Sequence, residues 1–155
     1  GPAPAMALKN YAQLGMKLPV YMPHAAVNQE LIKLAGSAAE GARMPTAAFV
    51  VVDALPDDDK SKAVGNSYYQ AYKDAYKTAA SPFGANTYDA LMIVADAIKR
   101  AGSTDKAKVR DAIEQTHGLV GLNGTFYMSP TDHNGLNMDS LRMVEVRGGK
   151  FVMAK

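Results

Sequence analysis

The chain has 155 residues, of which 48% are hydrophobic and 21% are charged. This composition is typical of a globular domain and excludes a disordered or low-complexity chain. The net charge is only +2 and no stretch concentrates Lys and Arg, which excludes a phosphate-tracking surface and argues against a nucleic-acid partner. Because the chain contains no cysteine, thiolate zinc sites, thiol nucleophiles and disulfide scaffolds are also excluded.

The N-terminal residues 1–4, Gly-Pro-Ala-Pro, contain neither an initiator Met nor the regions of a signal peptide. We therefore expect a segment of a longer protein whose targeting signal lies outside it. No apolar run approaches the roughly 20 residues of a transmembrane helix. The longest runs, 49–52 and 90–95, are of the size found in protein cores.

The first third of the chain predicts two helices and two strands. Apolar residues recur at helical spacing over 5–14, which predicts an opening helix. The apolar run 18–22 predicts a short strand, and Asn28 is expected to cap a helix over 29–35. The uninterrupted apolar run 47–52 predicts a strand buried on both faces, as in α/β sheets.

A long helix is predicted over 64–76, after three aspartates at 57–59 that would stabilise its N-terminus. Calcium binding is the alternative interpretation of the aspartates, and the helix start is favoured over it. Four tyrosines of this helix share helical spacing, which favours packing over a ligand-binding platform. They are Tyr68, Tyr69, Tyr72 and Tyr76.

The next helix is predicted over 87–101, after a loop at 81–86. Because it is apolar almost all round, we expect it to be sandwiched inside the protein. A further helix is predicted to be capped by Ser103 or Thr104 and to end at Gly118.

Short β segments follow at 124–128, 141–146 and 150–154. Gly148 and Gly149 separate the last two, which predicts a two-residue hairpin. Helices that alternate with buried strands, followed by this hairpin, predict an α/β fold with a small antiparallel element at its C-terminal end.

Motifs of catalysis are missing from the sequence, which has no phosphate-binding loop and no GxGxxG, GxSxG or HExxH pattern. The sequence Asp-His-Asn-Gly at 132–135 resembles a metal-binding corner, but a tight turn is the favoured interpretation. At Asn123-Gly124-Thr125, the hairpin signal of Asn-Gly is stronger than the glycosylation acceptor. We therefore predict a non-enzymatic protein without a metal or cofactor.

Two places could contact a ligand. His24 follows Pro23 at the carboxyl end of the predicted strand, where α/β sheets present groups to ligands; a surface or capping histidine is an equally good interpretation. The loop 81–86 precedes the predicted buried helix, whose N-terminal amide groups could hold a carboxylate. An ordinary connecting loop is the alternative there.

Five segments together resemble a known family. They are LIKLAGSAAEG (31–41), YDAL (88–91), IKRAG (98–102), VRDAIE (109–114) and MSPTDHNGL (128–136). In this order they resemble the C-terminal half of the solute-binding proteins of branched-chain amino acid ABC transporters. The resemblance extends over nearly the whole chain.

This resemblance implies an α/β three-layer sandwich of the type I periplasmic binding protein kind, with a C-terminal antiparallel hairpin. Such proteins have two lobes and hold the ligand in the cleft between them. Residues 1–49 would belong to the second lobe, 50–135 to the first, and 136–155 would return to the second. The resemblance also implies export to the periplasm and delivery of the ligand to an ABC permease. A ligand-sensing domain of a signalling receptor is the alternative function.

By the same resemblance, seven residues match positions that line the cleft. They are Pro2, Ala3, Pro23, His24, Phe83, Ala85 and Asn86. The position of His24 is often acidic in amino-acid binders, and that of Ala85 is often aromatic, so the methyl group would enlarge the pocket. These differences imply an aromatic or other organic carboxylate as ligand, with an amino acid as the alternative.

Half of a two-lobed protein would expose sheet edges and apolar faces. We therefore expect this chain to repack, to dimerise or exchange elements with a second copy, or to remain bound to the rest of its parent protein.

Overall fold

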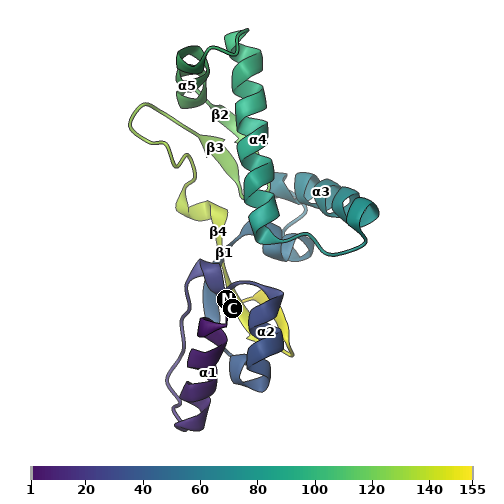
Figure 1. The fold of residues 1–155 in the computed structure, drawn as a ribbon, viewed down its shortest axis with the longest axis vertical. Coiled ribbons are helices and arrows are strands. Elements are labelled where there is room, and N and C mark those ends of the chain that lie inside the picture. Colours follow the sequence, from purple (N-terminus) through teal and green to yellow (C-terminus); the bar gives the residue numbers. More distant parts are fainter. Residues whose placement is uncertain (1, 155) are drawn as a thin grey trace. The chain divides into compact units, whose positions relative to one another are not determined.

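A computed structural model describes residues 2–154 of the chain (Figure 1). The chain divides into two units, of which unit 1 comprises Gly1–Thr46 and Arg142–Lys155 and unit 2 comprises Ala47–Leu141. The divisions fall after residues 46 and 141, whereas the predicted lobe boundaries follow residues 49 and 135.

Two short helices of unit 1 form where the sequence predicts them. Helix α1, Ala3–Gln13, begins after Pro2. Helix α2, Gln29–Ala35, has the predicted cap, because the Asn28 side chain accepts a hydrogen bond from the Leu31 amide at 2.9 Å. It packs against α1 through buried side chains that include Leu8 and Leu31.

A three-stranded sheet is the other main element of unit 1. Its order is β1 (Arg43–Ala47), β4 (Leu141–Arg147) and β5 (Lys150–Met153). The antiparallel pair β4 and β5 confirms the predicted hairpin: Gly148 and Gly149, at φ +59° and +69°, form the two-residue turn.

The strand predicted over 18–22 is reduced to a single parallel bridge between Tyr21 and Arg43. The Arg43 amide donates to the Val20 carbonyl at 2.9 Å, and the Met22 amide donates to the Arg43 carbonyl at 2.8 Å. The next bond of this ladder would come from residue 45 of β1, and Pro45 has no amide hydrogen to donate to the Met22 carbonyl. In the other direction, the Gly41 amide donates to the Val146 carbonyl at 2.9 Å instead.

A carboxylate holds the β4–β5 hairpin. Glu40 accepts hydrogen bonds from the amides of Gly148 at 2.9 Å and Gly149 at 2.8 Å. These bonds connect the turn before β1 to a hairpin more than 100 residues later in the chain.

We predict that Glu40→Ala lowers the free energy of unfolding by about 1 kcal/mol, because two charge-assisted hydrogen bonds at an exposed site are lost. Glu40→Gln, which keeps one acceptor, should lose less. Urea unfolding measures both variants against Asp53→Ala, in which an exposed carboxylate that makes no hydrogen bond within residues 2–154 is removed. Equal midpoints for all variants would contradict the role given to Glu40.

Unit 2 contains three helices and a two-stranded sheet within the described residues. The helices are α3 (Lys60–Tyr76), α4 (Pro82–Ala101) and α5 (Lys106–Glu114). The antiparallel sheet consists of β2 (His117–Val120) and β3 (Thr125–Tyr127). Helix α3 begins at Lys60, four residues before the predicted 64. The helix-start interpretation of the three aspartates is confirmed at Asp59, which caps α3 by accepting from the Ser61 amide at 2.9 Å.

The strand predicted over 47–52 is wrong. Strand β1 ends at Ala47, and Ala48–Ala54 forms two short 3₁₀ pieces joined at a kink at Val51, together called η3. Most of these side chains are buried as expected, but a short apolar run does not distinguish a buried strand from a buried helical turn. Helix α3 approaches η3 closely at Gly65, where an added Cβ would lie 2.6 Å from Val52 Cγ2.

The core of unit 2 is built around Phe49, Ala85 and Leu122. The ring of Tyr68 packs edge-on against Phe49, with centroids 5.5 Å apart, and lies 4.9 Å from that of Tyr88. The packing interpretation therefore holds for Tyr68, whereas Tyr76, at the end of the same helix, is exposed.

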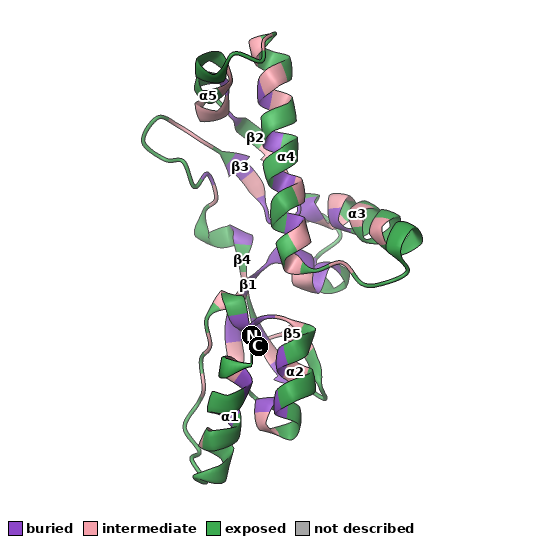
Figure 2. Cartoon of the chain, viewed as in Figure 1, coloured by how far each residue is buried: buried purple, intermediate pink, exposed green. Residues whose placement is uncertain are grey.

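Helix α4 begins earlier than predicted and is less buried than predicted. It begins at Pro82 rather than Thr87, because Ser81 caps it through the Gly84 amide at 3.2 Å. It is not sandwiched on all sides, since Leu91 is 65% exposed (Figure 2). The cap of α5 is Asp105, which accepts from the Lys108 amide, instead of Ser103 or Thr104.

Candidate functional site

Four of the seven predicted site residues lie in unit 1. Pro2 is the N-cap of α1 and Ala3 is its first residue, and both are exposed. Pro23 is exposed and extended, and His24 begins the 3₁₀ helix η1, His24–Ala26.

His24 is held by its backbone and leaves its ring available. The Ala26 amide donates to the Pro23 carbonyl and the Val27 amide to the His24 carbonyl, each at 2.9 Å. The half-buried imidazole makes no hydrogen bond within residues 2–154. A neutral imidazole without internal partners offers one nitrogen as a donor and the other as an acceptor.

The other three predicted residues lie in the first two turns of α4 in unit 2. Phe83 is 61% exposed and Asn86 is also exposed. The amides expected to hold a carboxylate are mostly occupied: Pro82 has none, and those of Gly84 and Ala85 donate to the Ser81 hydroxyl and carbonyl. This leaves Phe83 as the residue of the first turn whose amide has no hydrogen-bond partner in the described part of the chain.

Ala85 is placed differently from the expectation. Its side chain is fully buried, with Phe49 and Leu122, in the core of unit 2. Such a methyl group fills a core instead of enlarging a surface pocket, which argues against direct contact with a ligand. Sequence reasoning placed Ala85 in a loop because the helix was expected to begin after it.

We predict that Ala85→Phe destabilises the chain by about 1 to 3 kcal/mol, because the core around Ala85 has no room for a ring. Urea unfolding followed by circular dichroism measures the effect. The neighbouring substitution Asn86→Phe, at an exposed position, should change the midpoint little. If the two variants unfold at the same midpoint, Ala85 does not occupy a packed core.

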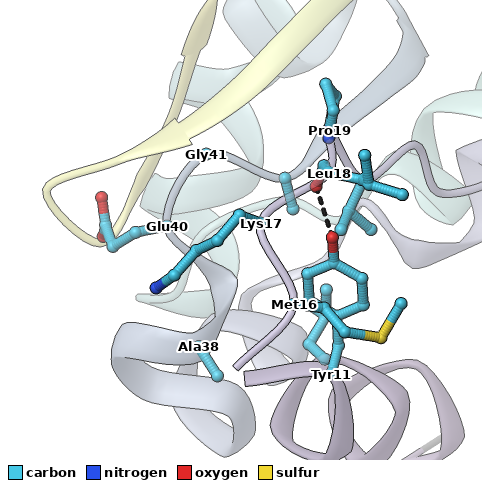
Figure 3. Close-up of a pocket in the computed structure, with 11 residues that line it drawn as sticks. Tyr11, Met16, Lys17, Leu18, Pro19, Ala38, Glu40 and Gly41 are labelled. Atoms are coloured by element: carbon cyan, nitrogen blue, oxygen red, sulfur yellow. Dashed lines mark hydrogen bonds between the residues drawn. The ribbon is translucent and has the colours of Figure 1, made fainter. Parts of the chain in front are cut away.

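A pocket of about 320 Å³ lies in unit 1, between α1, the segment that follows it and the turn before β1. Figure 3 shows Lys17 and Glu40 on one side of this pocket and Tyr11 and Met16 on the other. The Tyr11 hydroxyl donates to the Leu18 carbonyl at 2.6 Å, and the Glu40 carboxylate is occupied by the hairpin. None of the seven predicted site residues lines this pocket.

A smaller pocket, of about 210 Å³, lies in unit 2 and has Asp89 in its wall. One Asp89 oxygen accepts from the Leu122 amide at 2.8 Å. The other accepts from the backbone and side-chain amides of Asn123 at 3.0 and 2.8 Å. Burial raises the pKa of the Asp89 carboxyl, and these hydrogen bonds act in the opposite direction. A carboxylate with three donors anchors the loop 121–123 to α4 and is poorly suited to move protons.

Sequence reasoning missed this role of Asp89, for which the signal is a charged residue in a helix that is apolar almost all round. The same contact decides the interpretation of Asn123. Asn123 as a residue is 8% exposed and its side-chain nitrogen donates to Asp89, so the folded chain does not present it for glycosylation.

We predict that Asp89→Asn lowers the free energy of unfolding by about 1 to 3 kcal/mol, because the new amide nitrogen would face one of three hydrogen-bond donors. Asp53→Asn, at an exposed carboxylate, is the matched control and should have little effect. A variant as stable as the unchanged chain would show that Asp89 does not anchor the loop.

The segment 132–135 forms the predicted turn. The Asp132 carboxylate accepts from the amides of Asn134 at 3.0 Å and Gly135 at 3.1 Å, and Gly135 has φ +68°. No group of three or more potential metal-ligating side chains occurs among residues 2–154. In the same residues, no helix combines the length and hydrophobicity needed to cross a bilayer.

Comparison with known proteins decides the family. Residues 1–150 match the family described as periplasmic binding protein. The chain belongs to the periplasmic binding protein family. This confirms the resemblance inferred from the five sequence segments. No curated protein is significantly similar to the chain.

Solved structures of binding proteins agree with this assignment. An extracellular ligand-binding receptor from Rhodopseudomonas palustris is 31% identical, with a TM-score of 0.88 over 97% of this chain and 44% of its own. A leucine-binding protein from Thermotoga maritima is 26% identical, with a TM-score of 0.83 over 99% and 41%. A type 1 periplasmic binding protein from Bordetella pertussis, 24% identical, shares the fold with a TM-score of 0.78 over 99% and 43%.

The predicted fold class, an α/β fold of the type I periplasmic binding protein kind, is therefore confirmed. The chain spans less than half the length of each of these proteins.

Proposed function

We propose that this chain is part of a solute-binding protein of an ABC importer that works in the periplasm, binds a small molecule and delivers it to the permease subunits. The observation that carries the proposal is the match of residues 1–150 to the periplasmic binding protein family. The leucine-binding relative from Thermotoga maritima supports a small carboxylate as the class of ligand.

In this proposal, unit 1 belongs to the second lobe of the parent protein and unit 2 to the first, and the ligand is bound in the interlobe cleft. His24 and Pro23, with Pro2 and Ala3, would contribute from one lobe. Phe83 and Asn86 would contribute from the other. Ala85 would act indirectly, because its buried methyl group holds the first turns of α4 in place.

The ligand we propose is an aromatic or other organic carboxylate, with an amino acid as the alternative. A histidine pairs less well than a carboxylate with the ammonium group of an amino acid, but it can donate a hydrogen bond to a carboxylate. The exposed ring of Phe83 offers an apolar surface for the remainder of such a ligand.

We propose no catalytic step for this protein. Asp89, the buried carboxylate with a raised pKa, is fully hydrogen-bonded within the protein. A ligand-sensing domain of a signalling receptor would have the same site, so the site does not distinguish the two functions. Adjacent genes do: permease genes would support transport and a signalling gene would support sensing.

We predict that His24→Ala in the full-length protein weakens ligand binding by about 1 to 3 kcal/mol, because the ligand carboxylate loses its partner. A thermal-shift screen with aliphatic amino acids, aromatic carboxylates and dicarboxylates first identifies the ligand class. Titration calorimetry then compares the unchanged protein, His24→Ala and the control His133→Ala, whose side chain is 69% exposed and lies by Glu114.

Unchanged affinity in His24→Ala would place His24 outside the site. If no member of the panel stabilises the full-length protein, the proposed ligand class is wrong.

A further inference from the structure

The pocket of unit 1 is a cavity that the proposed function does not use. Its volume of about 320 Å³ lies at the lower end of the range of small-molecule sites in proteins, which is about 300 to 1,000 Å³. All of its lining residues belong to unit 1, and none of the seven predicted site residues is among them. A ligand bound in this pocket therefore occupies a site separate from His24 and Phe83.

Most of the pocket wall is apolar. Leu8 is buried, whereas Met16 is 45% exposed and Leu18 is 72% exposed. The Tyr11 hydroxyl donates to the Leu18 carbonyl at 2.6 Å, so its proton is not available to a ligand and Tyr11 contributes mainly its ring. The wall therefore offers aliphatic and aromatic contacts to the apolar part of a small molecule.

Lys17 is the cation of the pocket wall. Its ammonium group forms no ion pair and no hydrogen bond within residues 2–154. Glu40 lies on the same side of the pocket (Figure 3), but its two oxygens accept from the amides of Gly148 and Gly149 at 2.9 and 2.8 Å. These donors offset part of the Glu40 charge, and the charge of Lys17 has no such partner.

Two backbone amides add hydrogen-bond donors to the same wall. The Val20 carbonyl accepts from the Arg43 amide at 2.9 Å, but the amides of Leu18 and Val20 have no partner in the described part of the chain. Ammonium and amide N–H groups are the donors that bind carboxylates in proteins. The pocket thus combines donors for a carboxylate with an apolar wall.

We propose that this pocket is a second binding site, which takes a small monocarboxylate with an apolar tail. Lys17 pairs with the carboxylate, and Met16 and Leu18 contact the tail. An amino acid fits the wall less well, because its ammonium group needs an acceptor and the Glu40 carboxylate is already bonded to the hairpin. Isocaproate, which has the side chain and the carboxylate of leucine but no ammonium group, is therefore the probe.

Methyl NMR of the full-length product of the gene tests the site. The protein is labelled with methionine that carries ¹³C in its methyl group, and sodium isocaproate is added stepwise. The Met16 signal is identified by its loss in Met16→Leu, and that of Met138, which is 78% exposed in unit 2, by its loss in Met138→Leu. We expect a saturable shift of the Met16 signal and no shift of the Met138 signal.

Three changes should weaken this binding in different ways. Lys17→Gln should lower the affinity at least about threefold, because an exposed ion pair is lost, whereas Lys9→Gln, at an exposed position of α1 outside the wall, should not. Ala38→Leu, which enlarges a side chain of the wall, should abolish the Met16 shift. The uncharged methyl ester of isocaproate should not produce the shift at the same concentrations.

The absence of a saturable Met16 shift would overturn the proposal, as would equal affinities of Lys17→Gln and Lys9→Gln. Tighter binding of leucine than of isocaproate would show that an ammonium group is recognised, and the proposed ligand class would be wrong. His24→Ala separates this site from the interlobe site. The Met16 shift should persist in that variant, and its loss would assign the shift to the interlobe site instead.

Discussion

The hydrogen bonds of the Asp89 carboxylate are the interaction on which unit 2 depends. A buried carboxylate costs several kcal/mol unless hydrogen bonds compensate for its lost hydration. Here three donors from Leu122 and Asn123 converge on it, and no side chain fits at Gly121, where a Cβ would lie 2.7 Å from the Asp89 oxygen. The contact fixes α4 to the loop between β2 and β3 and orients the rest of the helix.

That orientation determines which parts of α4 are available for other roles. Ala85 points into the core with Phe49 and Leu122, while Phe83 and Asn86, in the same two turns, remain exposed. The Asp89 contact, together with the burial of Ala85, therefore holds the first turns of α4, whose exposed residues we propose to contact a ligand.

The features that could be predicted from sequence are those fixed by neighbouring residues. Asn28 caps α2 within three residues, and Gly148 and Gly149 supply the positive φ angles of their hairpin. The predictions failed where contacts between residues far apart in the sequence determine the local structure. The run 47–52 is buried by α3 and α4 as a 3₁₀ helix, and its apolar residues alone could not distinguish that outcome from a strand. Ser81-Pro82 was interpreted as a break between helices, although a serine cap followed by proline also begins a helix.

The predictions for the candidate site also succeeded or failed according to whether local or distant residues determine the structure. The resemblance selected His24 and Phe83, and the structure leaves the side chains of both accessible, wholly or in part. It also selected Ala85, whose burial depends on Phe49 and Leu122, 36 and 37 residues away in the chain. Asp89 was overlooked because its three donors lie more than 30 residues further along the sequence.

Hydrogen–deuterium exchange of the full-length protein, with and without the ligand found by the thermal-shift screen, tests the proposed binding role most directly. We predict that the ligand slows exchange in two separate segments, the amides of η1 from His24 to Ala26 and those of the first turns of α4, and leaves α5 unchanged. Protection confined to other segments, such as the walls of the unit 1 pocket around Tyr11 and Leu18, would contradict the proposed site.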